Sequence, residues 1–352
     1  MIDICDMTSE ELEDFLTEIG EKPFRGRQIF RWIYKGAVDF EDMSDLPADI
    51  RKKLSRQACI GTVREERVRI SEKDGTRKYL FALDDGNTIE TVLMKYSYGN
   101  SVCISSQAGC AMGCAFCASA EGGRKRDLTA GEMTGQIMGV CRESGEKVGH
   151  VVVMGTGEPF DNYENTAKAI RIINHKNGLG IGMRNITVST CGIIPGIRRF
   201  AEDFPQVNLA VSLHAADDAD RTRLMPVNKK YSVDQLLAVC RKYTQRTGRR
   251  ITFEYALIRG VNDSSEQLDL LAGKLRGMLS HVNIILLNDV AGKSLRGSSR
   301  EYVYKAAERL EKQGVPATVR RELGSDIDAA CGQLRLRHMK ISADSSSENE
   351  EI

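Results

Sequence analysis

The sequence lacks long hydrophobic runs and a strong net charge. No apolar run in its 352 residues approaches the ~20 residues that a membrane-spanning helix needs, and no apolar leader opens the chain. Its 50 lysine and arginine residues are nearly balanced by 49 aspartate and glutamate residues, which leaves a formal net charge of +1. We therefore expect a soluble, cytoplasmic protein that does not bind membranes. Any nucleic acid would have to be bound by local basic patches rather than by the overall charge.

The cysteines lack the regular spacing of a disulfide framework, and ten of them in a chain of this length indicate a reducing compartment. Cys110, Cys114 and Cys117 instead follow the pattern C-x3-C-x2-C. No Cys or His pair follows at the distance that a zinc site requires, because the next cysteine is Cys141 and the next histidine is His150. Unrelated buried thiols are the simpler alternative. The density of thiols favours a metal centre with one position left open for a small molecule.

Residues 1–57 show three amphipathic helical patterns. The first begins at a capping box formed by Thr8 and Glu11, the second covers residues 26–34, and the third follows Pro47. We interpret this region as a small helical domain with many arginine and lysine side chains on its surface. Such side chains usually form a solvated charged face and less commonly a face that docks RNA.

Residues 58–98 change to a period of two. Asp-Gly turns at 74–75 and 85–86 separate predicted strands near 64–72, 77–83 and 87–95, which indicates a small antiparallel β extension. Glu90 lies in the third of these strands. A glutamate in such a strand usually faces solvent, although it could instead face a site.

Residues 99–340 alternate short apolar strands with amphipathic helices. The predicted strands are 102–105, 150–154, 185–189, 207–213, 251–257, 282–287 and 317–320, and the predicted helices lie near 129–144, 162–176, 232–246, 264–279 and 299–313. Several strands are continuous apolar runs, which is typical of a parallel sheet covered on both faces. We predict an α/β fold, a whole or partial β/α barrel, with residues 341–352 as a disordered acidic tail.

Polar or glycine-rich residues follow the predicted strands, and the carboxyl ends of barrel strands are where catalytic side chains gather. These residues are the stretch 155–159 (Gly-Thr-Gly-Glu-Pro), Ser189, the stretch 212–214 (Ser-Leu-His) and Asn288. Singly, they can be a tight turn, a loop histidine or a helix cap. Together they predict a ring of ligand contacts around one opening, in which Glu158 suits a ligand ammonium and Ser189, Ser212 and Asn288 suit ribose or carboxylate groups.

The motif Cys-Ala-Met-Gly-Cys-Ala-Phe-Cys (110–117) resembles the cluster loop of the radical S-adenosylmethionine superfamily. In that superfamily three cysteines hold a [4Fe-4S] cluster, and its fourth iron binds the methionine moiety of S-adenosylmethionine. The chain is also similar, over nearly its whole length, to the RlmN-type adenine-C2 RNA methyltransferases. The motifs that carry this similarity are Cys-Ile-Ser-Ser-Gln-Ala-Gly-Cys (103–110), Gly-Thr-Gly-Glu-Pro (155–159), Ser-Leu-His (212–214), Leu-Leu-Asn (286–288) and Gly-Ser-Asp-Ile-Asp-Ala-Ala-Cys-Gly-Gln-Leu (324–334). The sister Cfr-type enzymes, which methylate adenine C8, usually have Ala where this chain has Pro159.

The resemblance implies a fold and a set of residue roles. It implies a radical S-adenosylmethionine barrel whose cluster is held by Cys110, Cys114 and Cys117. It assigns the S-adenosylmethionine site to Gly157, Glu158, Ser189, Ser212, Leu213, His214 and Asn288. Cys331 would be the methyl-carrying cysteine, Cys103 its resolving partner and Glu90 an active-site acid or base. Without the resemblance, a buried structural thiol would be the preferred interpretation of Cys331.

The resemblance also implies a reaction that uses two S-adenosylmethionine molecules per turnover. Carbon 2 of adenine lies between two ring nitrogens and is too electron-poor to attack a methyl group directly. Cys331 would first take the methyl group, and a 5′-deoxyadenosyl radical would then remove a hydrogen from it. The methylene carbon would add to adenine, and Cys103 would release the product by forming a disulfide with Cys331. The implied partners are 23S ribosomal RNA, in some members tRNA at the adenosine after the anticodon, and an electron donor such as flavodoxin or ferredoxin; we expect a monomer.

Several basic clusters are candidates for binding RNA, and Arg124-Lys125-Arg126, beside the cluster loop, is the strongest of them. Such phosphate contacts position RNA without specifying its sequence, so the target adenine would have to be exposed or flipped into the barrel mouth. Two other functions stay open. A radical S-adenosylmethionine activase of a protein partner would need neither RNA nor a methyl-carrying cysteine, and a non-catalytic iron–sulfur RNA-binding module would form no 5′-deoxyadenosine.

Overall fold

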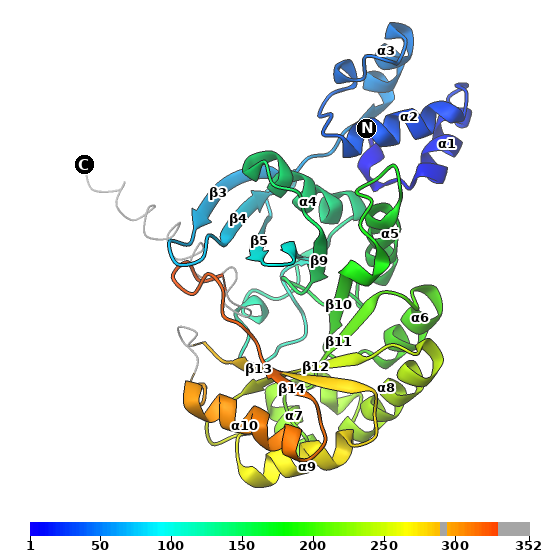
Figure 1. Cartoon of the computed structure of the whole chain (residues 1–352). Coiled ribbons are helices and arrows are strands. Elements are labelled where there is room, and N and C mark those ends of the chain that lie inside the picture. Colours follow the sequence, from blue (N-terminus) through cyan, green and yellow to red (C-terminus); the bar gives the residue numbers. More distant parts are fainter. Residues whose placement is uncertain (289–293, 330–352) are drawn as a thin grey trace, which may run out of the picture.

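The computed structural model describes residues 1–288 and 294–329 of the chain (Figure 1). Cys331 and the tail predicted at 341–352 lie outside these described residues. In the part of the chain that is described, no helix is both long and apolar enough to cross a membrane.

A small helical unit opens the chain and stands at one end of the molecule, blue in Figure 1. Its elements are β1 (Ile2–Asp3), η1 (Ile4–Asp6), α1 (Ser9–Glu18), α2 (Phe24–Tyr34), η2 (Phe40–Asp42), α3 (Ala48–Gln57) and β2 (Ala58–Cys59), where η marks a 3-10 helix. The predicted capping box is present, because the Thr8 hydroxyl accepts from the Glu11 N–H (3.2 Å) and the Glu11 carboxylate accepts from the Thr8 N–H (2.8 Å). It fixes the start of α1, whose apolar face is buried.

The helical unit is joined to the rest of the protein by polar contacts. The Asp6 carboxylate accepts from the Gly131 N–H (2.7 Å), near the start of α4 (Ala130–Ser144). The Lys168 ammonium lies 2.8 Å from the Glu11 carboxylate. A carboxylate at a helix N-terminus satisfies an amide that has no partner within the helix, so α4 serves as the docking point of the unit.

One sheet of ten strands forms the centre of the protein, and its spatial order is β14-β13-β12-β11-β10-β9-β6-β5-β4-β3. Its strands are β3 (Arg64–Ile70), β4 (Arg77–Ala82), β5 (Thr88–Tyr96), β6 (Gly99–Ile104), β9 (His150–Val153), β10 (Ile186–Thr190), β11 (Asn208–Ser212), β12 (Ile251–Leu257), β13 (Ser280–Leu286) and β14 (Ala317–Val319). The strands from β6 to β14 are parallel, and β3 to β6 pair antiparallel. Because β14 and β3 are edges, the barrel is open, and the predicted partial β/α barrel is confirmed.

The antiparallel extension is part of the same sheet rather than a separate layer. β6 pairs with β5 on one side, where Val92 faces Cys103, and with β9 on the other, where Cys103 faces Val152. A tiny second ribbon, β7 (Gln107–Ala108) with β8 (Arg126–Asp127), lies at the mouth of the barrel. After β14, residues 320–329, which we call the strap, run back to the turn between β3 and β4 (Figure 1).

Helices cover the outer face of the sheet (Figure 1). After α4 they are α5 (Tyr163–Asn174), α6 (Ile194–Asp203), α7 (Asp218–Leu224), α8 (Val233–Thr247), α9 (Ser265–Leu275) and α10 (Arg300–Lys312), with 3-10 turns η3 (Ala118–Ala120), η4 (Met183–Asn185) and η5 (Pro226–Lys229). The sequence did not predict α6 or α7. Pro195 and Gly196 resemble a turn, but Pro195 sits in the first turn of α6, where no amide donor is needed. Gly196 is required because a Cβ there would lie 2.7 Å from Phe160.

The strand register gathers four of the predicted catalytic and ligand-binding residues on the inner face of the sheet. Partners across neighbouring strands share a face, as do alternate residues along a strand. The partners are Leu80 with Glu90, Val92 with Cys103, Cys103 with Val152, Val152 with Thr187, Ser189 with Ala210, Ser212 with Glu254, and Glu254 with Asn283. Glu90, Cys103, Ser189 and Ser212 therefore look into one concavity, while the alternate apolar side chains pack under the helices.

Candidate active site

The three predicted cluster cysteines lie in the loop between β7 and β8. Gly113 turns the loop with a φ of +67°, which a glycine adopts at no steric cost. The Ala115 N–H donates to the carbonyl of Leu224 at the end of α7 (2.9 Å), and the Cys117 N–H donates to the carbonyl of Cys114 (3.2 Å). The backbone hydrogen bond of Ala115, which lies between Cys114 and Cys117 in the sequence, thus fixes the loop to the barrel.

The thiols of this loop suit an iron–sulfur cluster. Burial raises the pKa of Cys110 to about 11, and the charge of Cys117 adds to the effect. Burial, followed by the charges of Cys117 and Cys110, raises the pKa of Cys114 well above its usual value. Three neighbouring thiols therefore resist ionising together unless a cation compensates them. Within the described residues no three acidic, His or Cys side chains converge on a single metal ion. A cubane would not require this, because each thiolate would bind a different iron.

His214 forms an aromatic wall beside this loop. Its ring contacts Phe116 edge to face, with ring centroids 4.7 Å apart. Its backbone has a φ of +55°, and its Nδ1 accepts from the Ala256 N–H (2.9 Å), which leaves the proton on Nε2. Burial, helped by the charge of Arg221, lowers the pKa of His214 to about 3. His214 therefore stays neutral at physiological pH and supports the loop without acting as a base.

The Gly-Thr-Gly-Glu turn joins three strand ends. Gly157 has a φ of +111°, and a Cβ there would lie 2.7 Å from the backbone nitrogen of Gln107. The Glu158 carboxylate accepts from the backbone N–H groups of Cys191 (2.7 Å) and Phe160 (3.0 Å), and its own N–H donates to the side chain of Gln107 (2.9 Å). Burial raises the pKa of Glu158. These contacts connect the ends of β6, β9 and β10.

The other predicted ligand contacts lie on the neighbouring strand ends. Ser189 and Ser212 are half-buried on the inner face, and Leu213 is fully buried. The N–H groups of Leu213 and His214 both donate to the carbonyl of Glu254 on β12 (3.0 and 3.3 Å). Asn288 follows β13 and lines a small cavity together with Cys103. The structure therefore brings these predicted residues to one mouth.

Glu90 and Cys103 lie further along the same face. Glu90 is buried, and its carboxylate lies 2.8 Å from the ammonium of Lys78. The same ammonium donates to the carbonyl of Asp328 in the strap (3.2 Å). Cys103 is buried in a small apolar cluster that also includes Leu323 and Ala329 of the strap. Glu90 is thus an inward residue rather than the solvent-facing one that its strand pattern usually indicates.

Arg221 on α7 is a central residue that the sequence analysis missed. It is fully buried, and its guanidinium donates to the carbonyls of Leu213 (3.1 Å), Ser212 (3.1 Å) and Cys191 (2.7 Å) and to the side chain of Asn228 (3.0 Å). These acceptors are neutral. An arginine in the run Asp-Ala-Asp-Arg-Thr-Arg resembles an exposed helix residue, so only the packing of α7 reveals its role.

The basic cluster favoured for RNA binding is occupied by internal ion pairs. Arg126 binds the carboxylates of Glu132 (2.6 Å) and Asp85, and Arg124 lies 2.7 Å from Asp161. These contacts hold β8, and with it the end of the cluster loop, against α4 and the extension. Both guanidinium groups therefore have a structural task, which weakens the case for them as the main phosphate contacts.

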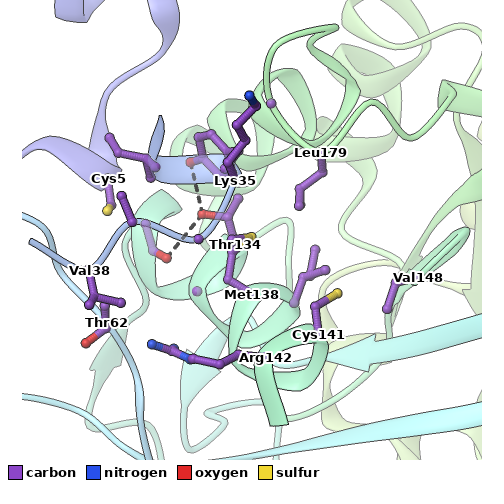
Figure 2. A pocket seen from close by; sticks show the side chains of 18 of the residues that line it. Cys5, Lys35, Val38, Thr62, Thr134, Met138, Cys141, Arg142, Val148 and Leu179 are labelled. Atoms are coloured by element: carbon purple, nitrogen blue, oxygen red, sulfur yellow. Dashed lines mark hydrogen bonds between the residues drawn. The ribbon is translucent and has the colours of Figure 1, made fainter. Parts of the chain in front are cut away.

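A large cavity lies elsewhere, between the helical unit and α4. It has a volume of about 780 Å³, and its walls include Cys5 and Lys35 on one side and Thr134 and Cys141 on the other (Figure 2). None of the predicted site residues within the described part of the chain lines it. It belongs to the docking region of the helical unit rather than to the barrel mouth.

Comparisons with known proteins agree with this geometry. Residues 2–60 match a family described as "Ribosomal RNA large subunit methyltransferase N-terminal domain", and residues 104–272 match the radical SAM superfamily. A Thermoanaerobacter sp. (strain X514) protein named "Probable dual-specificity RNA methyltransferase RlmN" is 50% identical over 341 residues, which are 97% of this chain and 99% of that protein. A Clostridioides difficile (strain 630) protein of the same name is 49% identical over 94% of this chain and 96% of its own length. A radical SAM methyltransferase from Sphaerobacter thermophilus has a TM-score of 0.91 and 45% identity over 95% of this chain and 99% of its own.

Acid should destabilise the metal-free protein through His214. The unfolded chain binds a proton at this residue near pH 6.5, whereas the folded protein binds it only near pH 3. Stability therefore falls as pH drops through this window, by about 2 kcal/mol between pH 7 and pH 5. Urea unfolding at several pH values should show that the free energy of unfolding of His214→Asn falls less steeply with decreasing pH, because this variant lacks the imidazole. Asn is a suitable replacement, since it tolerates positive φ and offers an acceptor to the Ala256 N–H. Equal pH slopes in both proteins would contradict this account.

Replacing Arg221 should destabilise the barrel mouth. Arg221→Met removes every guanidinium donor and leaves buried carbonyls unpaired, so we expect the free energy of unfolding to fall by about 3 kcal/mol. Arg223→Met on the same helix is the matched control, because Arg223 forms only an exposed ion pair with Asp220 and should change stability by less than about 0.5 kcal/mol. Urea titration measures both. A more stable Arg221→Met protein would mean that burying the charge costs more than its hydrogen bonds contribute.

Proposed function

The chain belongs to the RlmN family of radical S-adenosylmethionine RNA methyltransferases, and on that premise we propose that it methylates carbon 2 of adenosine in 23S ribosomal RNA and in tRNA at the position after the anticodon. The observation that carries this proposal is that Ala329 and Cys103 belong to one apolar cluster and line the same small cavity. Cys331 follows Ala329 by two residues, a chain length that spans at most ~7 Å. A methyl-carrying thiol and a resolving thiol can therefore meet, which an activase of a protein partner would not require.

The cofactor residues have separate tasks in this proposal. Cys110, Cys114 and Cys117 would hold the [4Fe-4S] cluster, and Gly157, Glu158, Ser189, Ser212, Leu213, His214 and Asn288 would line the S-adenosylmethionine site. When bound, cluster and cofactor would supply the radical that activates the methyl group. Glu158 is already hydrogen-bonded to two backbone amides, so its task is to shape the turn that approaches the ligand.

The two remaining cysteines and Glu90 would carry the methyl group from donor to product. Cys331, as thiolate, takes the methyl group of one S-adenosylmethionine by displacement, and the same carbon later becomes bonded to adenine C2. The adduct would carry an unpaired electron, which a one-electron acceptor such as the oxidised cluster would take up while Glu90 or Cys103 takes the C2 proton. The Cys103 thiolate then attacks the Cys331 sulfur, the carbon–sulfur bond breaks, and its electron pair stays on the new methyl carbon, which takes up a proton. A cellular dithiol must reduce the resulting disulfide before the next turnover.

The surroundings of Glu90 suit an acid or base. The Lys78 ammonium holds its carboxylate at 2.8 Å, on the same face as Cys103 and beside the strap. Proton transfer requires this kind of fixed geometry before anything else.

Binding of RNA would be shared between the mouth and the helical unit at 1–57. The extension at 58–98 and the barrel at 99–340 would form the catalytic part. An electron donor such as flavodoxin or ferredoxin would reduce the cluster. We propose that the protein works as a cytoplasmic monomer.

Nucleoside analysis of RNA incubated with the reconstituted enzyme tests this function. We expect 2-methyladenosine by mass spectrometry. Cys331→Ala should give no methylated product while it still forms 5′-deoxyadenosine, because it lacks only the methyl carrier. Cys103→Ala should accumulate RNA covalently attached to the protein, because the release step needs its thiolate. Cys240→Ala is the matched control, since Cys240 is buried within α8, outside the mouth, and should leave the product unchanged.

Other outcomes would identify the alternatives. Finding 8-methyladenosine without 2-methyladenosine would assign the chain to the Cfr type. Product formation by Cys331→Ala would remove the methyl-carrying cysteine from the scheme, as expected of an activase. Failure to form 5′-deoxyadenosine under reducing conditions would indicate a non-catalytic iron–sulfur protein.

A further inference from the structure

The strap connects the two edges of the open barrel. It leaves edge strand β14, where the Arg320 N–H still donates to the carbonyl of Ile284 (2.8 Å). It then crosses to the turn that precedes β4, next to edge strand β3 (Figure 1). The strap therefore spans the gap that the sheet leaves open, and in sequence it leads directly to Cys331.

Reciprocal hydrogen bonds attach the strap to this turn. The Asp326 carboxylate accepts from the Ser71 hydroxyl (2.7 Å) and from the Glu72 N–H (3.0 Å). In return, the Asp74 carboxylate accepts from the Gly324 N–H (2.9 Å). We call these five residues the clasp. The hydrogen bond from Ser71 holds the pKa of Asp326 below its usual value, so the clasp contains a charged acceptor at neutral pH.

The turn side of the clasp is formed in advance. The Ser71 oxygen accepts from the N–H groups of Lys73 (3.2 Å) and Asp74 (3.3 Å), so its single proton is directed to Asp326. The second oxygen of Asp74 accepts from the Thr76 N–H (3.0 Å). Because these contacts fix the turn without the strap, the strap binds to a rigid partner.

On the strap side of the clasp, the backbone of Gly324 lies very close to neighbouring atoms. Gly324 has a φ of +62°, and a Cβ there would lie 2.6 Å from the Cβ of Ala329 and 2.9 Å from Thr76. The Ile327 and Ala329 N–H groups both donate to the Gly324 carbonyl (3.1 Å), which folds the strap into a compact turn. That fold places Ala329 at the cavity that Cys103 also lines. The clasp therefore determines where the chain arrives before Cys331.

We propose that the clasp positions the chain that leads to the methyl-carrying cysteine: Ser71, Asp74 and Asp326 hold the strap across the open barrel so that Ala329, two residues before Cys331, stays at the mouth that Cys103 lines. This inference rests on the proposed function, which gives Cys331 its role. Ser71, Asp74 and Asp326 are positioning residues, because they act through the strap and touch no reacting atom. Their contacts with the strap are three hydrogen bonds, so the strap can also release to admit a nucleotide.

Space at the mouth supports a strap that releases. The cavity between Cys103, Met154, Asn288 and the strap has a free volume of only about 50 Å³. Ligand pockets usually measure at least ~300 Å³. An adenosine therefore needs the strap to move outward, and the clasp is one of the contacts that return it, beside the hydrogen bond from Lys78 to Asp328.

Substitution of Asp326 in the full-length, cluster-reconstituted protein tests the clasp. Asp326→Asn keeps the size of the side chain but weakens both hydrogen bonds, and we expect amide exchange of Glu72 and of the strap to rise about tenfold. The rate at which Cys331 is methylated by S-adenosylmethionine, followed by intact-protein mass spectrometry, should fall about tenfold. The amount of 5′-deoxyadenosine formed per methylated adenosine should rise, because cleavage proceeds while the carrier is out of place. Asp269→Asn, an exposed carboxylate on α9 paired with Arg309, is the control and should match wild type.

A second pair of variants at the other side of the clasp keeps the test independent of folding. Ser71→Ala removes the hydroxyl, whereas Ser71→Thr retains it. Only Ser71→Ala should therefore form more 5′-deoxyadenosine per methylated adenosine than the wild type. Wild-type methylation and coupling in both Asp326→Asn and Ser71→Ala, despite faster strap exchange, would overturn the clasp as a positioning device. Unchanged strap exchange in both variants would equally overturn it, because the contacts would not hold the strap.

The outcomes also separate this inference from the proposed function. If Cys331→Ala abolishes methylated RNA while the clasp variants behave as wild type, only the clasp fails. If Cys331→Ala retains product, the proposed function fails, and with it the reason for positioning this cysteine.

Discussion

The site depends on the register of β6, which pairs antiparallel with β5 and parallel with β9. Cys103 faces Val92 on one side and Val152 on the other, and these pairings join the extension to the barrel as one sheet. A slip of one residue would turn Cys103 under the helices and bring Val102 or Ile104 to the inner face. Such a slip is opposed because Val102 and Ile104 are fully buried in the main core. Apolar packing on the outer face therefore fixes the position of the chemistry on the inner face.

Buried polar groups, rather than apolar packing, hold the strand ends together at the mouth. Glu158 connects the turn after β9 to the end of β10, and Arg221 connects the ends of β10 and β11. A ligand site must expose polar backbone, and each buried carbonyl or amide there needs a partner. Long side chains from outside the strands satisfy those groups without filling the opening. This explains why the site is rigid although its lining is polar.

The sequence predicted the parts of this arrangement that depend on local pattern. Continuous apolar runs such as 151–153 and 284–287 identified the parallel strands, and the C-x3-C-x2-C spacing led to the prediction of a cluster loop, which stays a prediction. The pairing of β5 with β6, the helices α6 and α7, and the buried Arg221 were not predictable in this way, because each is decided by contacts between distant segments. The resemblance to a family supplied roles for Glu90 and Cys103, but their common face follows only from the strand register.

An open barrel fits a macromolecular substrate better than a closed one. A closed barrel admits only ligands small enough to pass through its mouth. A target nucleotide stays covalently linked to its RNA strand, so the site must be open enough to admit it together with the flanking RNA. Leaving the sheet open exposes two edges, which invite pairing with other chains. β14 is short, and β3 is rich in charged residues and has a register shift between Glu65 and Arg67, features that discourage such pairing. The gap can then be crossed by the strap. The strap can move away from the opening, whereas a strand paired along its whole length would close the barrel permanently.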